Sequence, residues 1–117
     1  LEKKAEIEQI ATAQAKAFFY ASNFSLGVNL FFQLNEYLAK LMSKHSQYQL
    51  SMEEIHHTEK KDAPSGTAIS LAKGIMENYS QKTSWVNHET ENQEEIAIIS
   101  KREPHVPGTH IVTYSSP

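Results

Sequence analysis

Residues 54–67 (Glu-Ile-His-His-Thr-Glu-Lys-Lys-Asp-Ala-Pro-Ser-Gly-Thr) gather the most chemically capable side chains of the chain in one short segment. Histidine changes its protonation state near neutral pH, so His56 or His57 could act as a general acid. Lys60 follows as a fixed cation that can attract a carboxylate or donate a proton. The turn at 65–67 leads into a helical pattern, and the N-terminus of a helix favours an anion. Together these features predict a site that binds an anionic substrate and transfers a proton.

Each of these features also has an ordinary structural explanation. Two adjacent histidines can simply end a strand, and Lys60 can be a solvated amine, as we expect Lys61 beside it to be. Ser65 can merely cap the helix that follows. These explanations are independent of one another, whereas a single anion site accounts for all the features at once. We therefore favour the functional interpretation of the segment.

Two other kinds of site are disfavoured. The chain has six histidines, but none pairs with another at the spacing of two metal ligands on one helix face, and adjacent residues of a strand diverge. Nucleophilic catalysis lacks support because Ser65 lies in no strained strand-to-helix elbow motif and the chain has no cysteine. We expect neither a metal centre nor a nucleophilic residue.

Bulk composition narrows the class of protein. With 117 residues the chain is one domain at most, and its formal net charge of −3 argues against nucleic acid or an anionic membrane as the principal partner. Polar residues interrupt every apolar run before a membrane-spanning length, and no signal-peptide pattern opens the chain. The chain begins with Leu1 rather than Met, and Pro117 closely follows a strand pattern. We interpret it as an interior segment of a longer protein.

Apolar periodicity predicts an α/β domain of the α+β-like kind. Helical patterns cover 2–16, 26–45 and 66–79, and strand patterns cover 17–21, 48–53, 96–101 and 109–115. The expected buried faces are Val28, Phe31, Leu34, Leu38, Leu41 and Met42 in the second helix, and Ala68, Ile69, Ala72, Ile75, Met76 and Tyr79 in the third. Residues 80–94 read as a polar loop that Trp85 and Val86 could anchor, and the two histidines fall at or just past the end of the 48–53 strand.

The connections between these elements predict the kind of sheet. A short turn joins the last two strands, which must therefore be antiparallel. We predict a mixed or antiparallel sheet of about four strands with helices packed on one face. The four glycines never approach the G-x-G-x-x-G pattern of a dinucleotide site.

Three segments resemble a known family. The pattern E-x-H-H-x-x-K-x-D-A-P-S-G-T-A, from Glu54 to Ala68, resembles the signature of bacterial dihydrodipicolinate reductase (4-hydroxy-tetrahydrodipicolinate reductase). Residues 21–29 (Ala-Ser-Asn-Phe-Ser-x-Gly-Val-Asn) resemble the stretch where the first domain of that family crosses into the second. The segment from Arg102 to His110, which includes Gly108, also fits. The resemblance covers nearly the whole chain.

The resemblance implies roles for individual residues. His56 would be the general acid/base, and Lys60 would be the proton donor near the substrate. The other implied contacts are to a substrate carboxylate, from His57, Lys60, Ser65, Gly66 and Thr67, and to the nicotinamide of NADH or NADPH, from Ala21, Ser22, Asn23 and Phe24.

For the protein as a whole, the resemblance implies a cytoplasmic homotetramer that reduces a small dicarboxylate, 4-hydroxy-tetrahydrodipicolinate, on the route to diaminopimelate and lysine. Residues 1–20 would end the nucleotide-binding domain or link to it, and residues 21–117 would form a substrate-binding and oligomerisation domain that is truncated at its C-terminus. The absent N-terminal domain would bind most of the cofactor, so we expect the chain alone to be inactive. The alternatives are a non-catalytic oligomerisation module and a dicarboxylate-binding module without redox chemistry. The intact His56 and Lys60 argue against the first.

Overall fold

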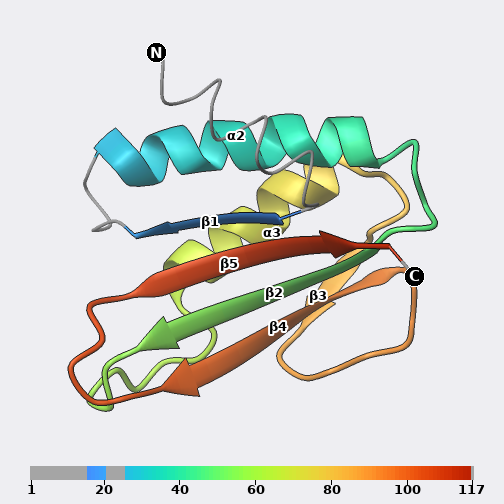
Figure 1. The fold of residues 1–117 in the computed structure, drawn as a ribbon. Coiled ribbons are helices and arrows are strands. Elements are labelled where there is room, and N and C mark those ends of the chain that lie inside the picture. The colour runs from blue at the N-terminus through green and yellow to red at the C-terminus, as the bar shows by residue number, and fades with distance from the viewer. Residues whose placement is uncertain (1–15, 21–25, 117) are drawn as a thin grey trace.

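The computed structural model of the chain describes the backbone of residues 16–20 and all of residues 26–116 (Figure 1). Its elements, in chain order, are β1 (Lys16–Tyr20), α2 (Leu26–Met42), β2 (Gln49–His56), α3 (Gly66–Asn78), β3 (Ser84–Val86), β4 (Glu95–Arg102) and β5 (Thr109–Ser115). The helix predicted over 2–16, apart from Lys16, which begins β1, and the predicted cofactor contacts at 21–24 lie outside the described residues.

The strands form one sheet in the order β1-β5-β2-β4-β3. β2 is parallel to β4 and antiparallel to β5, so of the two kinds of sheet that the sequence predicted, mixed or antiparallel, the sheet is the mixed one, with five strands. Within the predicted polar loop, Trp85 and Val86 belong to the short edge strand β3, which pairs in parallel with β4. β4 and β5 do run antiparallel, as predicted, but they are not neighbours because β2 lies between them. The turn between β4 and β5 therefore passes the C-terminal end of β2, where the Glu103 N–H donates to the His56 carbonyl at 2.9 Å.

Both helices lie on the same face of the sheet, as predicted (Figure 1). The helix α2 follows the predicted apolar stripe except at Leu41, which is 42% exposed. With about 100° of rotation per residue, Leu41 falls just outside the stripe, and Asn35 and Ala39 extend the buried face on its other side. In α3, Leu71 is fully buried, while Ile69 and Met76 are only partly buried.

One apolar core fills the space between the helices and the sheet. Its members come from both helices and from β2, β4 and β5, and they include Phe31, Leu38, Met52, Leu71, Ile75, Ile96, Ile98, Val112 and Tyr114. The buried Asn35 joins the two helices, because its side-chain amide donates to the Leu71 carbonyl at 2.9 Å. No helix in the described part of the chain is both long and apolar enough to span a membrane.

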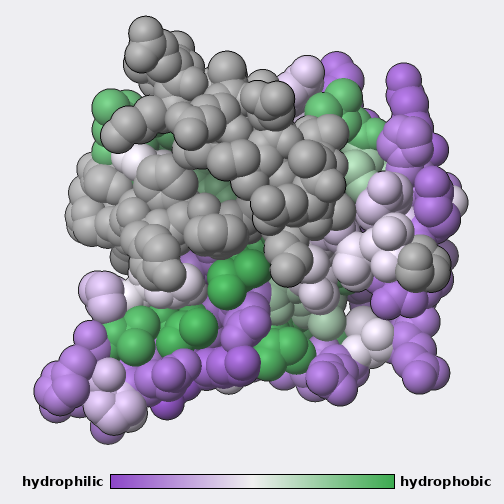
Figure 2. Space-filling model, in the orientation of Figure 1, coloured by the Kyte–Doolittle hydropathy of each residue, from purple (hydrophilic) through white to green (hydrophobic). Residues whose placement is uncertain are grey.

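Neither of the two helices in the described part of the chain lies on the opposite face of the sheet. On each strand, every second residue points away from the core to this side; examples are Ser51, Glu53 and Thr113. In the view of Figure 2, hydrophobic side chains lie among hydrophilic ones over these strands. Among the described residues, one face of the sheet thus forms the core with the helices, and the other, which we call the open face, carries no helix.

Candidate active site

A buried carboxylate, Glu54, lies at the centre of a polar cluster near the C-terminal ends of β2 and β4. Leu50 and Met52 point into the core, and the alternation along β2 continues this inward face to Glu54, which is 0% exposed. The strand register places Ser100 of β4 and His110 of β5 directly beside Glu54. A buried ionised group needs several partners to offset its lost hydration, so this position must be richly hydrogen-bonded.

Glu54 accepts hydrogen bonds on both carboxylate oxygens. Its Oε1 accepts from His56 Nδ1 at 2.5 Å and from Arg102 Nη1 at 3.0 Å. Its Oε2 accepts from the Ser65 N–H at 3.0 Å and the Ser100 hydroxyl at 2.8 Å. Burial by itself would raise the pKa of Glu54, but these hydrogen bonds, led by that from Ser100, outweigh it and lower the pKa. Glu54 is therefore ionised at neutral pH.

His56, the predicted general acid/base, ends β2 and is held by this carboxylate. Because an ionised carboxylate only accepts hydrogen bonds, the His56 Nδ1 must carry a proton. The other nitrogen, Nε2, lies on the side of the ring that faces Gly108, where an added Cβ would come within 3.4 Å of it. The side chain is 12% exposed. Proton exchange with a bound molecule would therefore take place at Nε2.

We expect Gly108→Ala to lower the free energy of unfolding by about 1–3 kcal/mol, because its φ of 132° lies in a region that only glycine adopts without strain. The new methyl group would also lie in contact with the His56 ring, 3.4 Å from Cδ2 and Nε2. Urea denaturation measures the loss. Gly66→Ala is the matched control, since Gly66 has open space around its Cβ position and an ordinary φ. Equal stability of the two variants would contradict the expectation.

Lys60 lies in the loop after β2, and Arg102 fastens this loop to the sheet. The Arg102 Nε–H donates to the Lys60 carbonyl at 3.1 Å, and its Nη2 donates to the Asp62 carbonyl at 2.6 Å. The Lys60 Nζ is 3.4 Å from Asp62 Oδ1, and the lysine side chain is 28% exposed. The ammonium group is thus held near the cluster while it remains accessible to a ligand.

His57, which follows His56, has a different environment. It lies just beyond β2 and is exposed, and its Nδ1 accepts from the Glu59 N–H at 3.2 Å. Its role as a substrate contact stays a prediction.

The beginning of α3 completes the site. Ser65 is the N-cap residue, and its hydroxyl accepts from the Ala68 N–H at 3.2 Å and lies 3.2 Å from His110 Nε2. Because its own N–H also donates to Glu54 and it is 2% exposed, Ser65 primarily fixes the turn. Gly66 is exposed and opens the helix. The helix dipole places a partial positive charge at this end, which favours an anion such as a carboxylate.

His110 lies behind His56 as a buried, neutral ring. It is 5% exposed, and the two ring centroids are 5.1 Å apart in an edge-to-face arrangement. Burial lowers the pKa of His110 to about 4; the charges of His56 and Lys60 act in the same direction, and that of Glu54 opposes them. His110 is therefore uncharged at neutral pH.

The structure thus brings His56, Lys60 and the start of α3 to one end of the sheet. It adds partners for which the sequence predicted no separate role: Glu54, Ser100, Arg102 and His110. The residues that the structure describes include no group of three or more His, Asp or Glu side chains that could hold a metal ion.

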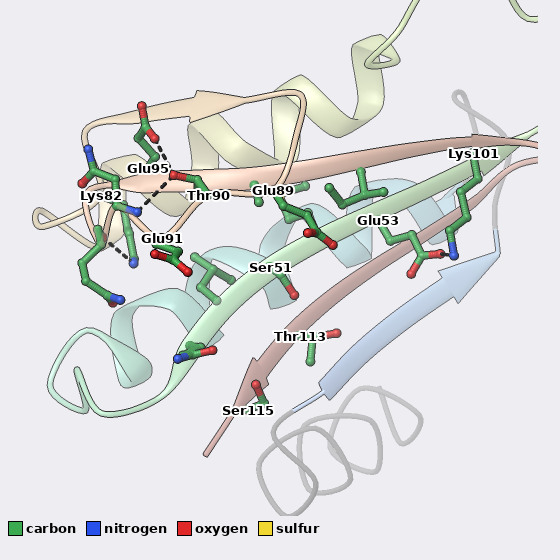
Figure 3. A pocket seen from close by; sticks show the side chains of 17 residues that line it. Ser51, Glu53, Lys82, Glu89, Thr90, Glu91, Glu95, Lys101, Thr113 and Ser115 are labelled. Carbon is green, nitrogen blue, oxygen red and sulfur yellow. Dashed lines mark hydrogen bonds and ion pairs between the residues drawn. The ribbon is translucent and has the colours of Figure 1, made fainter. Parts of the chain in front are cut away.

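Figure 3 shows a hollow on the open face of the sheet, the face that carries Ser51, Glu53 and Thr113. Side chains of β2, β4 and β5 form its floor, and residues 89–93 form one wall. Lys82 fastens that wall, because its Nζ donates to the Gln93 carbonyl at 2.6 Å. The lining carries both charges, including the Glu53–Lys101 ion pair at 2.5 Å. None of the residues of the polar cluster around Glu54 lines this hollow, and neither do His57 and Lys60.

The fold and the cluster together define an α/β domain with a polar, cation-bearing site where two strands end beside a helix N-terminus. The chain belongs to the dihydrodipicolinate reductase family: the model for "Dihydrodipicolinate reductase, C-terminus" matches residues 27–117.

The individual relatives that match the chain share one name. A 4-hydroxy-tetrahydrodipicolinate reductase from Christiangramia forsetii is 50% identical over 116 residues, which cover 99% of this chain and 48% of the relative. Proteins of the same name from Methanocaldococcus jannaschii and Aquifex aeolicus are 38% and 39% identical, over 97% and 95% of this chain and 42% and 43% of their own lengths. The chain therefore spans a little less than half the length of these curated relatives.

A solved structure, the dipicolinate-bound dihydrodipicolinate reductase from Paenisporosarcina sp. TG-14, matches with a TM-score of 0.43 and 21% identity, over 83% of this chain and 51% of that one.

Proposed function

We propose that this chain is the substrate-binding and catalytic domain of an NAD(P)H-dependent reductase that converts 4-hydroxy-tetrahydrodipicolinate to tetrahydrodipicolinate in lysine and diaminopimelate biosynthesis. Family membership and the shared name of the relatives support this proposal. The observation that carries it is the arrangement of His56 and Lys60, one held by a buried carboxylate and the other by the arginine that pairs with that carboxylate. A module that serves only assembly has no need of such an arrangement.

The proposed substrate carries two carboxylates, and the site offers positive potential in two places. The Lys60 ammonium is a compact charge with three donors, suited to one carboxylate. The backbone amides at Gly66 and Thr67 begin α3, where the helix dipole favours a second one. His56 would exchange a proton with the substrate at Nε2, because Glu54 holds the proton on Nδ1. The proposed conversion takes up one hydride and one proton and releases the 4-hydroxyl group as water, so proton delivery is what it requires from the protein.

The nicotinamide cofactor, NADH or NADPH, would supply the hydride when it is bound. The residues proposed to contact it, at 21–24, lie outside the described residues. The chain also has no glycine-rich pattern of the kind that holds a dinucleotide pyrophosphate. We therefore propose that another domain of the protein binds most of the cofactor.

The open face of the sheet is the surface that we propose for assembly into a homotetramer in the cytoplasm. Ile99 is half-buried there and Ala97 lines the same hollow, beside the Glu53–Lys101 ion pair. Apolar area flanked by charged pairs is the usual make-up of a contact between copies of a chain.

We expect this chain to bind pyridine-2,6-dicarboxylate, a planar analogue of the proposed substrate, in a calorimetric titration. Lys60→Ala removes a charged donor from a carboxylate, which contributes about 1.5–3 kcal/mol. The affinity should therefore fall by about 10-fold to 100-fold.

The matched control is Lys61→Ala, which removes the same charge at the exposed neighbouring position. Its affinity should stay within about 2-fold of the parent chain, since surface charges act weakly. An equal loss in both variants would indicate attraction by net charge alone. No binding to a folded sample would contradict the placement of the substrate site in this domain.

A further inference from the structure

We propose that Glu54 and Arg102 form a positioning pair: the carboxylate sets which nitrogen of His56 carries the proton, and the guanidinium holds the Lys60 loop. The catalytic meaning of the pair rests on the proposed function, but the state of the His56 ring does not.

The first step concerns the tautomer of His56. A neutral imidazole has one protonated nitrogen, and the hydrogen bond made by that nitrogen decides which one it is. Glu54 is buried, ionised and 2.5 Å from Nδ1, so it stabilises the Nδ1–H form. The Nε2 lone pair is then directed away from Glu54, towards the side of Gly108. The site is thereby ready to accept or return a proton at one defined atom.

The second step concerns the loop. Arg102 donates to Glu54 and, through its other nitrogens, to the carbonyls of Lys60 and Asp62. Only a planar guanidinium offers donors in these diverging directions, because an ammonium group is a single point of charge. The two bonded carbonyls lie on either side of Lys61, so they fix the backbone from which the Lys60 side chain projects.

The third step connects the two. His56 and Arg102 are register partners on β2 and β4, and both bind the same oxygen, Oε1 of Glu54. Residues of one sheet therefore position both the proton carrier, His56, and the cation, Lys60, although Lys60 itself lies in a loop. Functional groups placed in this way need to lose less freedom when a ligand binds.

The charged and titratable groups around His56 are few in the described structure. Glu54 lies on the same strand, Arg102 on β4, His110 on β5, and Lys60 on the loop. The ring centroids of His110 and His56 are 5.1 Å apart, and the two rings make an edge-to-face contact rather than a hydrogen bond. Glu54 is the group that bonds Nδ1.

Long-range ¹H–¹⁵N spectra of the histidine rings test the first step. They are recorded on this chain at an alkaline pH at which the ring ¹⁵N shifts are those of neutral imidazole. We expect a single Nδ1–H tautomer for His56, assigned by loss of its signals in His56→Gln. In Glu54→Gln we expect the ratio of tautomers to change by at least about 10-fold, since a charge-assisted hydrogen bond is lost. Glu53→Gln, on the open face of the same strand, should leave the spectrum of His56 unchanged.

An Nε2–H tautomer or a mixture in the parent chain would overturn the proposal, even if Glu54→Gln does not fold. An unchanged tautomer in folded Glu54→Gln would also overturn it. These readings need no ligand. Failure of the proposed function would appear separately, as absent binding of pyridine-2,6-dicarboxylate to a chain whose His56 is fixed as expected.

Amide hydrogen exchange of Arg102→Lys tests the second step. We expect exchange of the Lys60 N–H, which donates to the His57 carbonyl at 3.1 Å, to accelerate by about 10-fold while α2 keeps its protection. Lys101→Ala, one residue away and exposed, is the control and should change neither. Equal acceleration in the loop and in α2 would indicate general loosening and would overturn the role of Arg102.

Discussion

Replacement of Glu54 by alanine is expected to lower the free energy of unfolding by about 3–5 kcal/mol, the usual loss when one partner of a buried ion pair is removed. Arg102, whose side chain is 21% exposed, would lose its counter-ion, and the Ser65 N–H and the Ser100 hydroxyl would lose their acceptor. Urea denaturation at neutral pH measures the change.

The neighbouring residue provides a matched control. Glu53 also forms an ion pair, with Lys101, but on the open face, where its side chain is 31% exposed. Glu53→Ala should lower stability by no more than about 1 kcal/mol, because solvent screens surface pairs. In the double variant of Glu54→Ala with Arg102→Met, the loss should be smaller than the sum of the two single losses, because the residues interact directly. Losses of equal size at 53 and 54 would contradict the central position of the buried carboxylate.

Much of the fold could be predicted because its helices and strands carry regular apolar patterns. The apolar stripe from Val28 to Met42 predicted α2, and the alternation of apolar and polar residues around Leu50 and Met52 predicted β2. The order of the strands could not be predicted in the same way. Periodicity reports which face of a strand is buried, but it says nothing about which strand lies alongside. The insertion of β2 between β4 and β5 therefore emerged only from the structure.

The candidate site was predictable where its residues are close in sequence. His56, Lys60 and Ser65 belong to one segment, so their types and spacing were enough to suggest an anion site. Arg102 and His110 reach the same place through the register of β4 and β5, which the sequence does not reveal. One signal was present in the sequence: every second residue of this strand pattern faces the core, and continuing from Leu50 and Met52 this places Glu54 on the buried side. An ionisable residue at a buried position requires partners, and a search for them would have led to these strands.

The second large effect concerns acid stability. The chain should lose about 2–3 kcal/mol of stability between pH 6.5 and pH 4.5 through His110 alone, because its pKa is lowered by burial from the ordinary 6.5 to about 4. In this range the unfolded chain binds a proton at His110 and the folded chain does not, so acid favours unfolding. Well above pH 6.5 neither state is protonated there, and well below pH 4 both are, so most of the slope from His110 falls between these two values.

Urea denaturation of the parent chain and of His110→Gln at several pH values between 7.5 and 4.5 tests this expectation. Glutamine keeps a donor and an acceptor near Ser65 but does not titrate, so the slope due to His110 should vanish in the variant. Glu54, whose pKa is lowered, loses its own contribution to stability only towards the acid end of this range, and it is present in both proteins, so it does not account for a difference between them. Parallel loss of stability in the two proteins would assign the acid sensitivity to another group. If stability falls towards acid pH in the parent chain but not in His110→Gln, the His110 ring is neutral in the folded protein. A neutral ring keeps a second positive charge away from His56. It also leaves the Glu54 carboxylate to His56 and Arg102.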